Sequence, residues 1–253
     1  MSTFSHSRVE TFNVCPFKYK LSYIEELDTL PNNDDPTNAL IIGSAMHMGI
    51  EQGLDKAIEL YKSEFNILSD EHYNEIIKFE KLLPKVERFI NRNSCEFELK
   101  LETDDFKGFI DYIEYRDNNE VAIYDFKYSN NIDRYLESDQ LHLYKYFYEQ
   151  LNPFKTVTEL GFIFIPKVNI RQKKTETIAQ FRKRLLNELA NKDVQLVKVE
   201  YNANCVINFF KNIKIVLETT DFEKKPSNFC RFCNFRNYCE NGQTWELVKK
   251  ITK

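Results

Sequence analysis

Apolar residues recur at helical spacing through most of the first third of the chain. The pattern predicts helical segments over residues 5–25, 39–62 and 69–91. Ser5 and Ser7 precede the apolar positions of the first segment, which begin at Val9, and are suited to cap a helix there. The segment can form one helix or a pair of short ones. Pro84 can kink the last segment, and residues 28–38, with two prolines among Asn and Asp, are predicted to form a loop. We therefore expect a helical N-terminal part.

The middle of the chain changes to the two-residue period of β-strands. Three such runs are predicted, over residues 96–101, 106–115 and 121–127. Asp117, Asn118 and Asn119 are turn residues that join the last two runs into a hairpin. Beyond it, helices and strands are predicted to alternate over residues 138–150, 157–165, 175–192, 194–199 and 204–218. A sheet flanked by helices, in the α/β class, is the expected core.

Length and composition limit what the chain can do. With 253 residues, of which 42% are hydrophobic, it can build one large mixed domain, or a core with a small appendage. It contains no G-x-x-x-x-G-K-[S/T] phosphate loop, so ATP-driven movement would have to come from a partner. It lacks a basic segment followed by an apolar run, and no stretch approaches the roughly 20 apolar residues that span a bilayer. We therefore expect a cytoplasmic protein without membrane contact.

The charge of the chain argues against a protein that coats nucleic acid. The formal net charge is −4, whereas bulk electrostatic binding needs a broad basic surface. A local basic groove is compatible with this charge. The most basic stretch has a single acid, Glu176, among Lys167, Arg171, Lys173, Lys174, Arg182, Lys183 and Arg184. A solvated helix face with its preceding loop explains this stretch about as well as a surface that follows a phosphate backbone.

Two aspartates of the hairpin indicate a metal site. Asp111 lies within an apolar strand, and Asp125 lies at the end of the next one. An ionised carboxylate in so apolar a strand is costly unless a cation compensates it, so the pair suggests a shared divalent metal. Asp125 and Lys127 are two positions apart and share one face of their strand. A metal beside an ammonium suits phosphodiester hydrolysis, although an Asp-x-Lys tripeptide alone more often marks a buried ion pair.

The spacing of these residues resembles that of a known family. Gly108-x-x-Asp111, followed on the next strand by Asp125-Phe126-Lys127, is similar to the catalytic core of the PD-(D/E)XK nuclease superfamily, in particular its RecB-type branch. The resemblance implies a restriction-endonuclease-like core with a central mixed sheet, and catalysis by Asp111, Asp125 and Lys127 with Mg or Mn. The chain has isoleucine before Asp111 and aspartate as the second acid, and both departures lie within family variation.

The resemblance extends to both sides of the hairpin. The branch carries a helix histidine upstream and a Q-x-x-x-Y helix downstream, which match His47, Gln140 and Tyr144. It implies that His47 binds the metal of the two aspartates and that the backbone carbonyl of Phe126 completes the set. The apolar neighbours of His47 alone would favour a core histidine. Gln140 and Tyr144 share one helix face and could steady the lysine or contact the DNA backbone, although ordinary packing explains them about equally well.

Cysteine spacing near the C-terminus indicates a second metal centre. Cys230, Cys233 and Cys239 form a C-x2-C-x5-C motif, and Cys15 is the candidate for a fourth ligand. In a reducing compartment, disulfides explain the 6 cysteines poorly. Spacing alone leaves both zinc and an iron–sulfur cluster open.

The cysteine motif resembles that of a subset of RecB-type nucleases, which includes the AddB-like subunits and the CRISPR-associated adaptation nucleases. One cysteine before the nuclease core and three after it hold a four-iron four-sulfur cluster there. The resemblance implies a single nuclease domain over residues 1–253, in which residues 1–25 and 226–240 form a cysteine cluster that ties the two ends together. Cys95 and Cys205 fall outside the pattern and are predicted to be buried small hydrophobes. The intervening aromatic residues are expected to shield the cluster, namely Phe229, Phe232, Phe235 and Tyr238.

The sequence therefore predicts a metal-dependent DNA nuclease that acts as an exonuclease on single-stranded or duplex ends. A nuclease module that works only in a larger complex, with a helicase, integrase or recombination partner, is the first alternative, because the chain carries no motor. A catalytically silent DNA-binding or inhibitory homologue is the second, although the intact Asp111, Asp125 and Lys127 argue against it.

Overall fold

The chain folds into two compact units. The structure is a computed structural model, and it describes residues 3–30, 35–244 and 247–249. The terminal unit comprises Met1–Asn32, Leu101–Gly108 and Asn202–Lys253. The sheet unit comprises Asn33–Lys100 and Phe109–Tyr201. That the whole chain is one nuclease domain stays a prediction.

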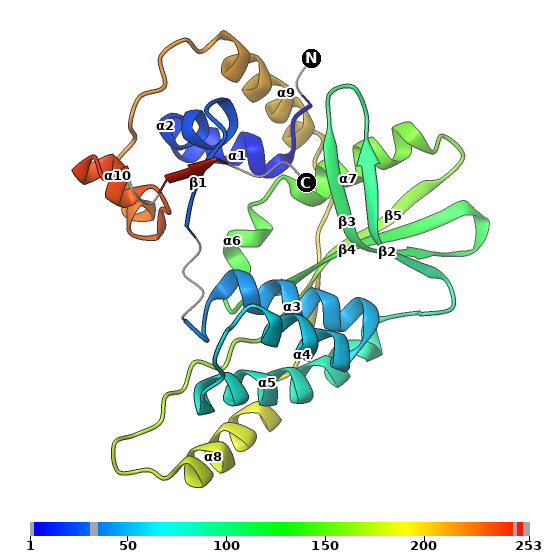
Figure 1. Ribbon diagram of the computed structural model, residues 1–253. Coiled ribbons are helices and arrows are strands. Elements are labelled where there is room, and N and C mark those ends of the chain that lie inside the picture. The colour runs from blue at the N-terminus through cyan, green and yellow to red at the C-terminus, as the bar shows by residue number, and fades with distance from the viewer. Residues whose placement is uncertain (1–2, 31–34, 245–246, 250–253) are drawn as a thin grey trace. The chain divides into compact units, whose positions relative to one another are not determined.

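The sheet unit begins with helices (Figure 1): α3 (Ala39–Gln52), α4 (Leu54–Ser63), α5 (Asp70–Val86) and the 3₁₀ turn η2 (Glu87–Phe89). The side chain of Asn38 caps α3 by accepting hydrogen bonds from its first backbone N–H groups. The predicted single helix over residues 39–62 is wrong, because α3 ends at Gly53. Its φ of 100° is a conformation that glycine adopts without steric cost. Pro84 lies in the last turn of α5 without ending it.

A five-stranded sheet forms the centre of the fold. Its strands, in order across the sheet, are β2 (Cys95–Glu102), β3 (Lys107–Tyr115), β4 (Glu120–Tyr128), β5 (Thr156–Ile165) and β6 (Gln195–Lys198). β4 and β5 are parallel, whereas β4 pairs antiparallel with β3 and β6 pairs antiparallel with β5. The predicted hairpin turn is confirmed as η3 (Asp117–Asn119), where Asn118 and Asn119 have positive φ angles. The predicted α/β class with a central mixed sheet flanked by helices is also confirmed.

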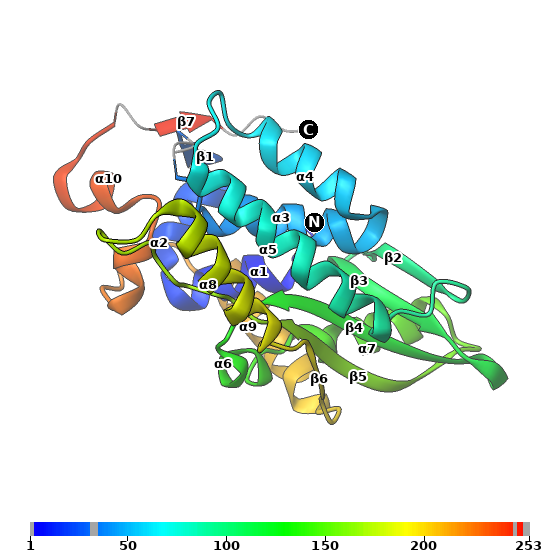
Figure 2. The ribbon, with the colours of Figure 1, turned by 90° about the horizontal axis from the view of Figure 1, so that it is seen from below.

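Helices cover both faces of the sheet (Figure 2). The helices that follow β4 and β5 are α6 (Ile132–Leu136), α7 (Gln140–Leu151) and α8 (Ile178–Ala190). α7 packs against β4 and β5 on one face. On the other face, α3, α4, α5 and α8 bury a hydrophobic core that includes Tyr112, Phe126 and Ile163 of the sheet. Because side chains alternate along a strand, Asp125 and Lys127 lie on the opposite face from Phe126.

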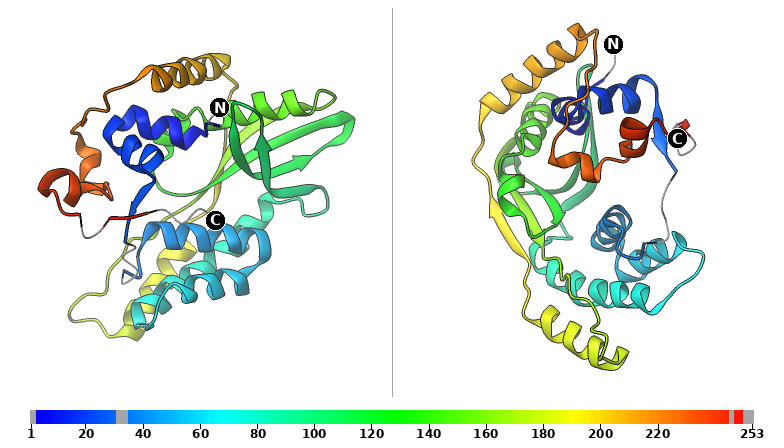
Figure 3. Two further views of the ribbon diagram at one scale, coloured as in Figure 1. Left: turned by 45° about the horizontal axis from the view of Figure 1, so that its top comes forward. Right: turned by 90° about the vertical axis from the view of Figure 1, so that its left-hand side faces the viewer.

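The terminal unit combines segments from both ends of the chain. Its elements are α1 (His6–Val14), α2 (Pro16–Tyr19), the π-helical turn η1 (Lys20–Ile24), β1 (Leu27–Thr29), α9 (Ala203–Glu218), the 3₁₀ turn η4 (Asn228–Phe232), α10 (Arg236–Asn241) and β7 (Leu247–Lys249). Ser5 caps α1 as predicted, and α1 packs along α9 (Figure 3). β1 pairs antiparallel with β7. It therefore occupies the start of residues 28–38, which were predicted as loop, while residues 31–34 lie outside the described part.

Among the described residues, no helix combines the length and the apolar character that crossing a membrane requires.

Candidate metal centre and cysteine cavity

The predicted catalytic residues of the sheet unit lie where the pairing between β3 and β4 ends. Tyr112 and Tyr124 are the last residues paired across these strands, and Asp111 and Asp125 lie one position beyond them. Asp111 Oδ2 accepts a hydrogen bond of 2.9 Å from the backbone N–H of Phe126. The Asp111 carboxylate thus accepts a hydrogen bond from a backbone N–H, a group that in a paired strand normally donates to a backbone carbonyl. This bond anchors Asp111 beside β4.

Asp125 is a buried carboxylate with unsatisfied oxygens. It is 1% exposed. The Lys127 ammonium forms an ion pair with it at 2.6 Å from Oδ2. Neither carboxylate oxygen accepts a well-aligned hydrogen bond from the described residues. Because buried charge is costly unless it is paired and hydrogen-bonded, a cation at these oxygens would lower the free energy of the site. Asp125 therefore fits a metal ligand.

His47 extends from α3 toward the same carboxylates. Its Nδ1 lies 3.7 Å from Asp111 Oδ2 and 3.9 Å from Glu98 Oε1. The ligand atoms of His47, Glu98 and Asp111 all lie within 4.8 Å of one another, which is close enough to hold one ion. The His47 side chain is 33% exposed, and its role as a metal ligand stays a prediction.

Glu98 is a member of this group that the sequence did not reveal. It belongs to a row of charged residues that alternate with apolar ones along β2, and so looks like an ordinary solvent-facing position. Its backbone φ of 50° is unusual, because non-glycine residues seldom adopt positive φ and do so at some energetic cost. This positive φ is visible only in the structure, and it occurs at a residue that could bind a metal.

The electrostatics of the site favour added positive charge. Burial, and then the charge of Asp125, raise the pKa of Asp111 to about 7, although His47, Lys127 and the Phe126 N–H act in the opposite direction. Burial lowers the pKa of His47, but the carboxylates around it outweigh this effect and the pKa is raised. Both groups therefore hold protons at higher pH than usual. A divalent cation would supply the same compensation.

Lys127 is held by a set of contacts from two helices and a strand. Burial lowers the pKa of Lys127, but the neighbouring Asp125 carboxylate outweighs it and the pKa is raised. The Gln140 side-chain oxygen accepts a hydrogen bond of 3.1 Å from the ammonium, and the Gln140 amide donates one of 2.8 Å to the Tyr144 hydroxyl. The ring of Tyr135, on α6, lies 5.3 Å from the ammonium. The structure thus brings Gln140 and Tyr144 to the lysine, and it adds Tyr135, which sequence reasoning missed.

Phe126 lies between Asp125 and Lys127 on β4. Its side chain packs into the core and lies edge-on to the His47 ring, with centroids 6.2 Å apart. Its N–H is bonded to Asp111. The metal-binding role of its carbonyl stays a prediction.

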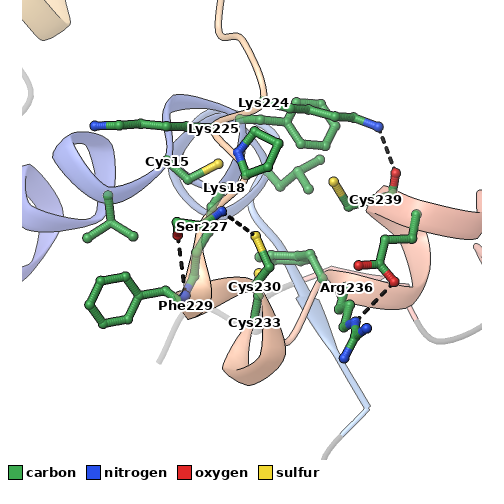
Figure 4. A pocket seen from close by; sticks show the side chains of 16 residues that line it. Cys15, Lys18, Lys224, Lys225, Ser227, Phe229, Cys230, Cys233, Arg236 and Cys239 are labelled. Carbon is green, nitrogen blue, oxygen red and sulfur yellow. Dashed lines mark hydrogen bonds and ion pairs between the residues drawn. The ribbon is translucent and has the colours of Figure 1, made fainter.

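Cys15 and the three cysteines of the C-x2-C-x5-C motif line one cavity of the terminal unit. The cavity has a volume of about 140 Å³, and Figure 4 shows the cysteine side chains around it: Cys15 just before α2, Cys230 in η4, Cys233 just after η4 and Cys239 in α10. Burial raises the pKa of the Cys233 thiol, although a backbone hydrogen bond at Phe235 and the nearby Lys18 act against it. The backbone N–H of Ser227 donates to Cys230 Sγ at 3.3 Å. The four lining cysteines are Cys15, Cys230, Cys233 and Cys239, and none is in a disulfide.

The four cysteines share this cavity without forming a tight cluster, and the iron–sulfur cluster stays a prediction. Within the described part of the chain, no three cysteine sulfurs lie within 4.8 Å of one another. The reason is that the thiols stand on the walls of a cavity instead of meeting at its centre. Cys95 and Cys205 do not line the cavity, and both are partly exposed instead of fully buried.

The aromatic residues of the motif shield the cavity unequally. Phe235 is 1% exposed and lines the cavity together with Phe229. Tyr238 stacks on Phe17, which also lines it, with ring centroids 6.3 Å apart. Phe232 is 78% exposed and is not part of the lining, so the expectation that it shields the cysteines is wrong.

Comparisons with known proteins agree with the geometry of the sheet unit. A family model described as the PD-(D/E)XK nuclease superfamily matches residues 3–240. A crystal structure from Eubacterium rectale, named as a candidate exonuclease, is similar in fold with a TM-score of 0.58 and 14% sequence identity, over 99% of this chain and 91% of that one. A comparison with curated proteins gives no match. The family match covers nearly the whole chain, and the chain belongs to the PD-(D/E)XK nuclease superfamily.

Proposed function

We propose that the protein is a divalent-metal-dependent DNA nuclease that removes nucleotides from strand ends. The observation that carries this proposal is the buried Asp125 carboxylate beside Asp111. Its Oδ2 forms an ion pair with the Lys127 ammonium at 2.6 Å, and its Oδ1 has no hydrogen-bond partner among the described residues. This is the arrangement that a catalytic cation would complete. Exonuclease action is supported by the fold of the Eubacterium rectale protein, which is named for it.

The metal ligands in this proposal are His47, Asp111, Asp125 and the carbonyl of Phe126, and the structure suggests Glu98 as a further one. Mg or Mn bound there would polarise the phosphate and lower the pKa of a bound water. Asp111, with its pKa raised to about 7, would give up its proton when the cation binds. The oxygen ligands suit either ion.

Lys127 acts in this proposal as a positive charge and not as a base. Its pKa is raised, so it stays protonated at neutral pH. Its ammonium can hold the attacking water and stabilise the negative charge that develops on the phosphate. Gln140 and Tyr144 position it by hydrogen bonds and do not need to touch the substrate.

The four lining cysteines hold a four-iron four-sulfur cluster in this proposal, as in the iron–sulfur subset of RecB-type nucleases. A zinc ion would draw the sulfurs to about 3.8 Å from one another, because Zn–S bonds are about 2.3 Å long and tetrahedral. No three described cysteine sulfurs lie within 4.8 Å of one another. The choice of a cluster over zinc therefore rests on the resemblance of the cysteine motif and not on this spacing. The cluster would act as a crosslink between Cys15 and residues 230–239, which stabilises the folded state.

DNA is the expected partner, and a cytoplasmic location remains the expectation from the sequence. The test uses protein purified without oxygen and end-labelled single-stranded and duplex DNA, with magnesium, with manganese or with chelator. We expect metal-dependent release of nucleotides from ends. A Lys127→Ala preparation, made in parallel, controls for contaminating nucleases. Strand binding without cleavage under any metal would contradict the proposal and favour a silent binding homologue.

A further inference from the structure

The basic stretch over residues 167–184 is divided by the fold into two groups. The Arg182 guanidinium has a structural role: it forms an ion pair with Asp70 at 2.8 Å and donates a hydrogen bond of 3.1 Å to Asn74. Arg184 forms a 2.7 Å ion pair with Glu176. These arginines hold α8 and the loop before it in place. They are therefore not free to bind a ligand.

The remaining cations of the stretch include two that line a cavity of about 330 Å³ in the sheet unit, between the start of α3 and the loop from β5 to α8. They are Lys167 and Arg171. In the described part of the chain, neither the Lys167 ammonium nor the Arg171 guanidinium forms an ion pair, in contrast to Arg182 and Arg184. Asn130 fixes the backbone at Lys167 through reciprocal hydrogen bonds of 2.8 and 2.9 Å. The Lys167 ammonium lies 5.2 Å from the centre of the Tyr128 ring, so its described contact is with an aromatic face and not with a carboxylate. The wall of the cavity thus carries positive charge without an acidic partner among the described residues.

Two further features make the cavity suited to an anion. Ala39, the first residue of α3, lines it, and because the Asn38 side chain already accepts from the N–H groups of Leu40 and Ile41, the helix contributes the positive end of its dipole and not free donors. Lys78 lies at its inner wall, 8% exposed and paired with Glu75 at 2.5 Å. Because Glu75 and Lys78 neutralise each other, the net positive charge of the lining comes from Lys167 and Arg171. An anion would be attracted there, and the oxygens of a phosphate group can accept charge-assisted hydrogen bonds from an ammonium and a guanidinium.

An adjoining cavity limits where the anion can lie. It has a volume of about 450 Å³, shares Lys78 and Arg171 with the first cavity, and adds the acids Asp35 and Glu71. Those carboxylates would repel a phosphate. The Lys167 side is therefore the anion-binding part.

The cavity lies on the same two elements that carry the candidate active site. Tyr128, which lines it, follows Lys127 directly on β4, and its side chain lies on the opposite face of the sheet from Lys127, which is the face covered by α3, the helix of His47. Ala39 precedes His47 by eight residues on α3, which corresponds to about 12 Å along the helix. A strand whose scissile phosphate lies at the metal site can reach this distance with a few nucleotides.

We propose that the cavity lined by Lys78, Lys167 and Arg171 binds a phosphate group of the nucleic-acid strand, a few nucleotides from the bond that is cleaved. This inference rests on the proposed nuclease function and adds a second contact to the same strand. It would fix the register of the strand without reading its sequence.

The test compares two double variants with equal loss of charge. Lys167→Gln with Arg171→Gln removes the cavity cations, and Lys173→Gln with Lys174→Gln removes exposed cations of the same stretch that do not line the cavity. Binding of a fluorescent single strand is measured by anisotropy in chelator, so that the strand stays intact. We expect the cavity variant to raise Kd about tenfold and to lower the salt slope by about 1 or more, and the control to change Kd less than about twofold.

A competition arm identifies the source of the phosphate. A deoxynucleoside monophosphate is added to the parent and to the cavity variant. Tight binding that depends on Lys167 and Arg171, with strand binding unaffected by the substitutions, would assign the cavity to a mononucleotide product and overturn the strand contact. Weak competition, with strand binding sensitive to the substitutions, supports the strand.

Cleavage by the parent, measured separately with magnesium, keeps the two proposals apart. A parent that cleaves DNA while both variants bind like the parent would overturn the phosphate site alone, as would equal weakening in both variants, which indicates diffuse electrostatics. A parent that binds strands through the cavity but never cleaves would overturn the nuclease function alone. A parent that neither binds nor cleaves would overturn both. Circular dichroism spectra of the variants check that the fold is kept.

Discussion

The metal centre of the sheet unit and the cysteine cavity of the terminal unit are built in opposite ways. His47, Glu98 and Asp111 already bring their ligand atoms within 4.8 Å of one another, because a long helix and paired strands carry them. The cysteines lie in or next to the short elements α2, η4 and α10 and surround a cavity of about 140 Å³. A site on regular elements can be preformed, whereas one on short segments depends on its ligand to draw it together. We therefore expect metal binding to matter for catalysis in the sheet unit and for folding in the terminal unit.

The largest effect is expected from the carboxylates of the sheet unit. Asp111→Ala or Asp125→Ala should reduce cleavage to background and weaken metal binding, because a water ligand cannot replace their charge. Cleavage of end-labelled DNA and calorimetric titration with manganese measure the two effects. The iron content should stay normal. Loss of iron in these variants would mean that the two sites are not independent.

Lys127→Ala should lower turnover by on the order of 100-fold while metal and DNA affinities stay nearly unchanged, because the ammonium acts on the charge of the transition state. Single-turnover kinetics separate this effect from binding. Lys127→Arg serves as a matched control that keeps the charge but not the shape. A variant that cleaves as fast as the parent would assign the activity to another site.

The cysteine cavity should respond in stability more than in chemistry. Replacing Cys15, Cys230, Cys233 or Cys239 by serine should bleach the brown colour expected of about four irons per chain, and should lower the thermal midpoint. Cys95→Ser and Cys205→Ser are the controls, because neither residue lines the cavity. Equal sensitivity at all six cysteines, or colourless parent protein with one zinc, would contradict an iron–sulfur cluster.

A smaller effect is expected where a ligand can be replaced by excess metal. His47→Ala should weaken manganese binding by on the order of 10- to 100-fold and lose activity that high manganese partly restores. Glu98→Gln should show a weaker version of the same behaviour, because its side chain is 45% exposed and can be replaced by water. Full activity of the His47 variant at low manganese would make the histidine a packing residue.

The smallest effect is a pH dependence of stability in the metal-free protein. The pKa of Asp111 is raised to about 7 in the folded state, above its unfolded value of about 3.9. The folded state therefore holds the proton more tightly, and the free energy of unfolding should fall as pH rises from about 4 to about 7. The raised pKa of His47 acts in the same direction, since its stabilising proton is lost as pH rises through that pKa. Urea unfolding in chelator should show less of this fall in Asp111→Asn, and magnesium should reduce it in the parent; a steeper fall in the variant would contradict the assignment.

Local rules explain which parts of the fold the sequence determined. The hairpin was predictable because alternation has a period of two and because Asn tolerates the positive φ of Asn118. The shared face of Asp125 and Lys127 followed from the same period. The break between α3 and α4 was missed because apolar spacing continues across Gly53, and only its φ of 100° ends the helix. The pairing of β1 with β7 was missed because the partners are more than 200 residues apart.

The sequence by itself determined the α/β class, the position of the hairpin and the identity of the residues able to bind a metal. These depend on backbone periods, turn residues and the chemistry of single side chains, which act over a few residues. Only the tertiary structure decided which of these groups meet. It brought Glu98 to His47, spread the thiols around a cavity, and paired Arg182 with Asp70 across 112 positions while Arg171 stayed at a cavity wall. Which groups meet depends on which distant segments pack together. The entropic cost of closing the loops between those segments does not follow from any local sequence pattern.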